Sequence, residues 1–271
     1  HCEVRGSEVI LGGDSHIHVY ENGGISTIGG VHPKTLKNNP DGTMDIDEIV
    51  EAIRHPEGEL YYPTTRLICL ENTHAKFAAV VVEDASLWNT QTSLMWQALG
   101  VPVHRLVQAA DSVSVCMSKG LGAPVGSVIV GSKLFITKAR RLRKTLGGGM
   151  RQVGVLCAAA YVALRDNLGK LADDHRRAKI FADGIKQIKH LSVDAATVET
   201  NMIFFSITGS TCLSPANLCQ VLEEHGVLAM PVSSTSVRLV LHHQISDNDV
   251  QYALTCIKQA VQKLLTDGAA K

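Results

Sequence analysis

The chain has 271 residues, of which 45% are hydrophobic and 19% charged, a composition typical of a folded globular protein and not of a disordered one. Its 26 basic residues balance 26 acidic ones, so no net field favours nucleic acid or an anionic membrane as a partner. No apolar run reaches the roughly 18 residues that a membrane-spanning helix needs.

Cysteine usage and the first residues indicate the compartment. The 7 cysteines are an odd number without a CxxC pair, and several lie in apolar runs where a free thiol behaves as a small hydrophobe. Reduced thiols predict a cytoplasmic protein, with the mitochondrial matrix as the alternative. The start, HCEVRGSEVILGG, carries no signal segment and no initiator Met, so we expect the chain to begin inside a longer parent.

The first two thirds of the chain combine short apolar runs with helical stretches. An early strand lies within GSEVILGG, and residues 65–72 (TRLICLEN) read as a buried parallel strand that ends in polar residues. Two further strands are expected over residues 111–118 and 126–132. The helices predicted after them cover residues 133–145, 151–167 and 168–189.

A second section reads as a smaller domain. Its closing helix starts with a capping box, in which Ser246 is followed three residues later by Asp249. Strands alternate with helices along the whole chain, which predicts two domains. The large one, over residues 1–190, is an α/β domain with a mainly parallel sheet, and the small one, over residues 191–271, is an α+β domain. The elements expected in the small domain are a strand over 201–207, a helix over 214–225, a strand over 236–241 and the helix from 246.

One lysine stands at the tip of a predicted strand. In SVSVCMSKGLGAPVGS the apolar alternation stops at Lys119, and glycines and a proline follow at once. Pro124 and a β-like run come next, so the glycines do not open a helix as a dinucleotide-binding loop must, and the sequence has no P-loop motif. Two interpretations remain: a tight turn with a solvated lysine, or a Schiff-base lysine whose glycine neighbours let a flat cofactor approach the backbone.

Other residues carry chemistry only in some contexts. His16 and His18 are either a metal pair on one face of a strand or exposed polar residues, and no third ligand is evident in the sequence. His74 closes a strand, where a lone histidine is more often structural. Arg238 lies inside an apolar strand and needs an anionic partner there, for which an acidic side chain is the structural candidate. The basic run over residues 138–144 reads mostly as a solvated helix face.

Five stretches together resemble the low-specificity threonine aldolases. These enzymes belong to the aspartate-aminotransferase-like (fold type I) class, which uses pyridoxal 5'-phosphate (PLP). The resemblance implies a fold type I large domain and favours Lys119 as the lysine that binds PLP. The stretches are GDSHIHVYENGG, LICLENTH, DSVSVCMSKGLGAPVGSVIVGS, ARRLRKTLGGGMRQVGVLCAAA and SVRLVLHHQIS.

The same resemblance implies roles for three more residues. His16 matches the histidine that stacks on the pyridine ring and helps to orient the substrate hydroxyl. His74 matches a second active-site histidine, a candidate for proton transfer at that hydroxyl. Arg238 matches the clamp for the substrate α-carboxylate, and one or more residues of the run 138–144 then lie near the cofactor phosphate.

Two elements of the family pattern are not where they belong. The Ser-Gly-Thr-Met-type loop that holds the PLP phosphate belongs before residue 1. A His-x-Asp-Gly-Ala-Arg segment, whose Asp binds the pyridine nitrogen, belongs between ENTH and ALGVPVHRL, where this chain is short. Asp84 in EDASLWN either stands for that Asp or lies in an ordinary loop left by a deletion, and the arginine is absent.

The resemblance implies retro-aldol cleavage of L-threonine or L-allo-threonine to glycine and acetaldehyde, by a homo-oligomer (a dimer or tetramer) that acts on small amino acids. Two alternatives stay open. One is an impaired homologue that only binds or oligomerises, and the other is a different PLP reaction such as β-elimination or racemisation.

Overall fold

The computed structural model describes residues 1–58, 60–72, 74, 76–77, 88–89, 103–108, 110–209 and 212–269. Contacts divide the chain into two units, His1–Leu168 and Gly169–Lys271, whereas the sequence placed a domain boundary near residue 190. Helix α8 (Leu171–Ile185) lies between these two positions, and it packs within the second unit against β8 (Met202–Ile207) and α10 (Asp247–Ala269). Within the described residues, none of the helices is long and apolar enough to cross a membrane.

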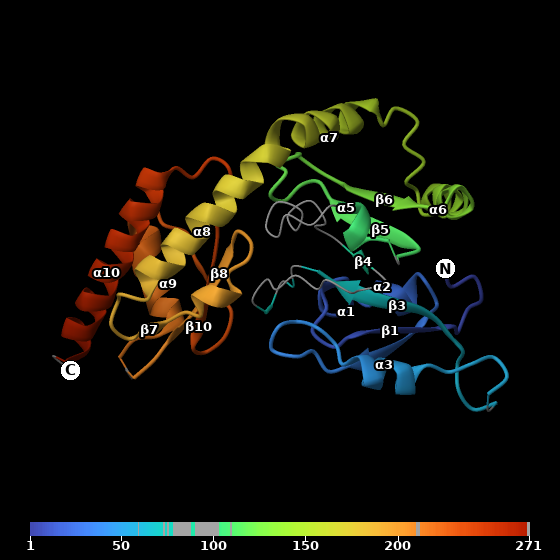
Figure 1. Cartoon of the computed structure of the whole chain (residues 1–271), viewed down its shortest axis with the longest axis horizontal. Helices are drawn as coiled ribbons and strands as arrows, with labels where there is room; N and C mark the ends of the chain where they lie inside the picture. Colours follow the sequence, from blue (N-terminus) through green and yellow to red (C-terminus); the bar gives the residue numbers. More distant parts are fainter. Residues whose placement is uncertain are drawn as a thin grey trace. The chain divides into compact units, whose positions relative to one another are not determined.

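A six-stranded sheet organises the first unit (Figure 1). Its strands stand in the order β2-β1-β3-β4-β5-β6. All neighbours are parallel except β5 and β6, which pair antiparallel, so the prediction of a mainly parallel sheet is confirmed. The strands are β1 (Glu8–Gly12), β2 (His32–Leu36), β3 (Thr65–Glu71), β4 (Trp88–Asn89), β5 (Ser112–Cys116) and β6 (Ser127–Gly131).

The helices of this unit include one that was predicted to the residue. Ser132 caps α6 by accepting the N–H of Phe135 at 3.2 Å, which fixes the start of the helix where the sequence placed it. His16 and His18, by contrast, lie on a short helix and not on a strand, so their spacing does not put them on one face. The helices are α1 (His16–Val19), α2 (Gly24–Thr27), α3 (Ile46–Ala52), α5 (Val103–Leu106), α6 (Lys133–Thr145) and α7 (Gly154–Asn167).

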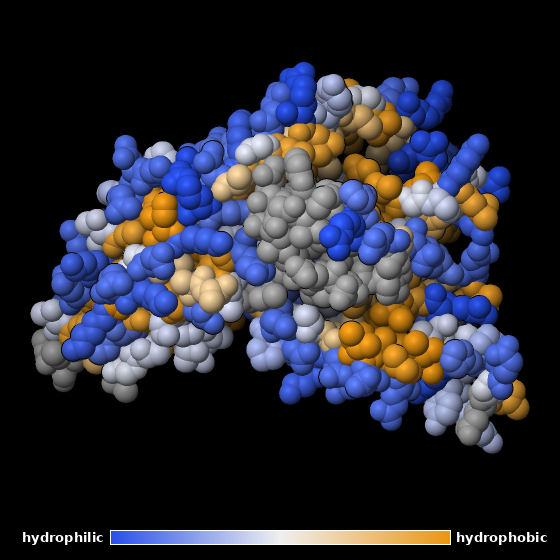
Figure 2. Space-filling view, in the orientation of Figure 1, coloured by the Kyte–Doolittle hydropathy of each residue, from blue (hydrophilic) through white to orange (hydrophobic). Residues whose placement is uncertain are grey.

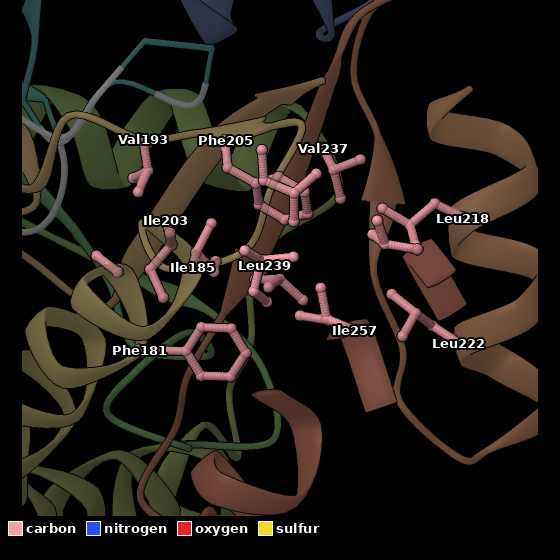
Figure 3. Close-up of a cluster of buried hydrophobic side chains, with 14 of the residues drawn as sticks. Phe181, Ile185, Val193, Ile203, Phe205, Leu218, Leu222, Val237, Leu239 and Ile257 are labelled. Atoms are coloured by element: carbon pink, nitrogen blue, oxygen red, sulfur yellow. The ribbon is translucent and has the colours of Figure 1, made fainter. Parts of the chain in front are cut away.

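The second unit packs three helices against an antiparallel sheet in the order β7-β8-β10-β9. Its core joins Phe181 and Ile185 of α8 to side chains of the sheet, α9 and α10 (Figure 3). The predicted capping box is confirmed, because Ser246 Oγ accepts the Asp249 N–H at 3.2 Å and Asp249 accepts the Ser246 N–H at 2.8 Å. The remaining elements are η1 (Leu168–Lys170), β7 (Leu191–Ser192), η2 (Ala195–Thr197), α9 (Pro215–Glu224), β9 (Met230–Pro231) and β10 (Ser236–Val240).

Candidate active site

Three of the predicted site residues follow the carboxyl ends of parallel strands. β1 pairs with β3, β3 with β4 and β4 with β5, so the carboxyl ends of these strands meet at one edge of the sheet. His16 follows β1, His74 follows β3 and Lys119 follows β5. Ligands of open α/β sheets bind at this edge. The topology thus gathers three residues that are far apart in the sequence.

Lys119 stands at the tip of a turn that its own backbone holds. Its carbonyl accepts the N–H of Gly122 at 2.8 Å, and Gly122 has a φ of +75°, which favours glycine there. The buried side chains of Met117 and Leu121 anchor the turn on both sides of the lysine. The Lys119 side chain is exposed, and within the part of the chain that the structure describes no hydrogen bond or ion pair engages its amine.

His16 is the first residue of α1, and both its backbone and its ring are held by carboxylates. Its N–H donates to Oε2 of Glu71 at 2.5 Å. Its Nε2 lies 2.8 Å from Oε1 of Glu21. Because a carboxylate only accepts, Nε2 carries the proton of a neutral ring and Nδ1 keeps a lone pair. The Tyr20 ring lies 5.4 Å from the imidazole.

His74 is almost fully buried, with 1% of its surface exposed. The Lys76 N–H donates to Nδ1 at 3.2 Å, so the neutral ring carries its proton on Nε2, which lies 3.7 Å from Glu71 Oε2. Burial lowers the pKa of His74, and Lys76 adds to this, whereas Glu71 and Asp14 act in the opposite direction. The net lowering keeps the ring neutral at neutral pH.

Sequence reasoning missed Glu71 and Gly42. Glu71 ends β3 and touches both histidines; an acid at the end of the apolar run LICLE was the available signal. Gly42 has a φ of +88°, and a Cβ there would lie 2.9 Å from the Cβ of His74. No pattern in the sequence marks that close approach, because the two residues are far apart along the chain.

The other predicted site residues belong to other elements or lie outside the described residues. Arg238 is a half-buried residue of β10 in the second unit, where it pairs in register with Phe204 of β8. Asp84 lies outside the described residues. All five basic residues of the run 138–144 on α6 are exposed, and Lys138 forms an ion pair with Glu3. The five are Lys138, Arg140, Arg141, Arg143 and Lys144.

The arrangement matches known proteins in sequence and in fold. The Beta-eliminating lyase family model matches residues 1–92 and 78–208. Low-specificity L-threonine aldolase 1 of Arabidopsis thaliana is 56% identical over 282 residues, which cover 96% of this chain and 77% of that relative. The low specificity L-threonine aldolase of Escherichia coli O157:H7 is 34% identical, over 91% of this chain and 74% of that relative.

A solved structure of Leishmania major threonine aldolase superposes with a TM-score of 0.73 at 18% identity, and the match covers 94% of this chain and 78% of that one. Such a likeness shows the fold alone. The fold is that of the fold type I α/β enzymes, and the family match makes the chain a PLP-dependent enzyme. The chain belongs to the beta-eliminating lyase family and, within it, to the low-specificity L-threonine aldolases.

An internal gap separates the chain from its relatives. The interval aligned with the Arabidopsis protein spans 282 residues, more than the 271 of the entire chain, so that relative has residues in this interval which the chain lacks. Both matches to the family model include residues 78–92, the region of Asp84.

The described residues fit the aldehyde end of PLP. A PLP enzyme needs a primary amine that can form a Schiff base, and the Lys119 amine is exposed and unengaged among the described residues. His74 Nε2 is buried and makes no hydrogen bond within the described structure, so it retains a donor for a bound group. Lys119, His16 and His74 are therefore the residues that would hold this end of the cofactor.

Proposed function

We propose that this chain cleaves L-threonine and L-allo-threonine to glycine and acetaldehyde with PLP as its cofactor. The observation that carries the proposal is the exposed, unengaged amine of Lys119 at the strand edge that also bears His16 and His74. The 56% identity to a low-specificity L-threonine aldolase supports the choice of substrate. PLP, when bound, supplies the electron sink for breaking the Cα–Cβ bond of an amino acid.

The two histidines differ in which ring nitrogen is available to the substrate, and therefore in whether they accept or donate a proton. His16 has its proton on Nε2, toward Glu21, so its Nδ1 lone pair is able to take the proton of the substrate β-hydroxyl. His74 has Nδ1 occupied by the Lys76 N–H, so its available atom is the Nε2–H donor. We therefore assign the base to His16 and a hydrogen-bond donor to His74.

Two further residues complete the proposal at the substrate and at the ring. Arg238 binds the substrate α-carboxylate, for which a bidentate guanidinium is well suited. Asp84, if it replaces the acid of the missing segment, holds the pyridine nitrogen. Family resemblance supports both roles.

A second copy of the chain is the proposed partner, besides the amino-acid substrate. An apolar surface of β6, α6 and α7 supports this; orange side chains gather over these elements in Figure 2. Exposed apolar surface of this kind marks protein interfaces. We define this β6–α7 surface by six residues that are each at least 50% exposed: Ile129, Val130, Leu134, Leu142, Val155 and Tyr161. Reduced cysteines support a cytoplasmic location.

The test is Lys119→Ala, with Lys37→Ala, an exposed lysine on another part of the unit, as the matched control. We expect Lys119→Ala to abolish the visible absorption band of protein-bound PLP and to lower acetaldehyde release from threonine by about 10³-fold or more. The control keeps both. Equal absorption spectra of wild type and Lys119→Ala contradict the proposal, and ammonia release from serine in place of aldehyde release points to β-elimination.

A further inference from the structure

We propose that Glu71 is a positioning residue that holds both active-site histidines at once, the backbone of His16 and the ring of His74. That these histidines act on a substrate rests on the proposed function. That Glu71 lies against both of them rests on the contacts described below.

The contact with His16 replaces a missing helix cap. α1 has four residues, and its N-cap, Ser15, makes no side-chain hydrogen bond to the helix. The Glu71 carboxylate, 55 residues away in sequence, accepts the His16 N–H at 2.5 Å instead. A charge-assisted hydrogen bond at a helix N-terminus is stronger than one between neutral groups. Glu71 thereby fixes the position of the backbone from which the His16 side chain extends.

The contact with His74 orients its ring. The same oxygen, Glu71 Oε2, lies 3.7 Å from His74 Nε2, and the Glu71 side chain is only 11% exposed. On the other side of the ring, Lys76 N–H binds Nδ1, Gly42 packs against Cβ, and the Phe77 ring lies 4.8 Å away. With Nδ1 engaged, the Nε2 proton lies beside Glu71 at a separation too long for a hydrogen bond, so the carboxylate acts on the ring through its charge.

The Lys76 N–H sets the tautomer of His74, and the Glu71 carboxylate lies beside the nitrogen that then carries the proton. Three charged groups face His74: Glu71 from β3, Asp14 from the segment after β1, and Lys76. Asp14 and Lys76 form an ion pair with each other, which leaves Glu71 as the carboxylate in contact with the ring. Removal of the Glu71 charge must therefore lower the pKa of His74 further, whereas removal of its oxygens must also release His16.

Two substitutions separate these effects. Glu71→Gln keeps an oxygen that accepts the His16 N–H but loses the charge, and Glu71→Ala loses both. For Glu71→Gln we expect the His74 pKa, measured from the ¹⁵N shifts of the imidazole, to fall by about one unit. PLP affinity stays close to that of wild type. For Glu71→Ala we expect in addition about tenfold weaker PLP binding.

Glu51→Gln, which changes an exposed acid on α3, is the control and leaves the His74 pKa unchanged. An imidazole pKa of His74 that is the same in wild type and Glu71→Gln overturns the inference, as does equal PLP affinity of the Gln and Ala variants. The NMR readout needs neither substrate nor turnover. If wild type fails to cleave threonine while the His74 pKa still falls in Glu71→Gln, the proposed function fails and the Glu71 assignment stands.

Discussion

Helices α6 and α8 have similar lengths, 13 and 15 residues, yet they bury very different surfaces. α8 buries seven residues, and four of them, Ala178, Phe181, Ala182 and Ile185, belong to the core of the second unit. α6 buries none, although it also carries apolar residues, including Leu134 and Leu142. An amphipathic helix gains its stability from packing its apolar side. α8 does so within its own unit, whereas α6 leaves its apolar residues exposed, which is the reason for proposing a second copy as its packing partner.

The largest change in stability is expected for a substitution in the core of the second unit. Leu222 of α9 is fully buried, so Leu222→Ala should lower the free energy of unfolding by about 2–5 kcal/mol. The matched control is Leu228→Ala in the same unit, where 77% of the side chain is exposed and the change should stay within about 0.5 kcal/mol. Urea unfolding followed by circular dichroism measures both changes. If the two variants unfold at the same urea concentration, Leu222 does not contribute to the core as described.

A buried histidine makes the second unit sensitive to acid. His175 of α8 is 5% exposed, and burial, with Lys179 as a smaller cause, lowers its pKa to about 4. Between its ordinary pKa of about 6.5 and this value, the unfolded chain binds a proton that the folded chain does not. This contribution to stability is therefore present above pH 6.5 and is lost as the pH falls toward 4.

We expect His175 to account for about 2–3 kcal/mol of the stability that wild type loses between pH 7.5 and 4.5. His175→Gln removes this part, so the variant should lose less stability than wild type over the same range, as measured by urea unfolding at the two pH values. His225→Gln, at an exposed histidine of the same unit, serves as the control. A loss that is the same for wild type and His175→Gln would show that this ring is not held neutral.

The parts of the fold and of the site that were predicted correctly depend on short-range patterns in the sequence. The Ser246–Asp249 box gave the start of α10, and the turn after β5 singled out Lys119. These features depend on neighbours within a few residues, and their geometry follows from local backbone chemistry.

Features that depend on distant contacts were not predictable in this way. The interaction of Glu71 with His16 joins residues 55 apart, and only the parallel pairing of β1 and β3 brings them together. The sequence also allowed a strand at His16, because nothing local shows that a carboxylate from β3 will cap a helix there. Likewise, the apolar run of β6 looks like any buried strand, although all five of its residues are exposed in the structure.

A substitution on the β6–α7 surface is expected to change the stability least. It should nevertheless change the oligomeric state clearly. Leu142 is 64% exposed on α6, so Leu142→Glu should alter the free energy of unfolding of the unit by no more than about 0.5 kcal/mol. A charge at this position must nonetheless disfavour apolar contact with a second copy, so we expect light scattering to show a smaller mass than for wild type. Leu228→Glu places the same charge at a similarly exposed leucine outside the surface and should leave the mass unchanged. Equal masses of an oligomeric wild type and Leu142→Glu would assign assembly to another surface, and the exposed side of α6 would then not be explained by a second copy.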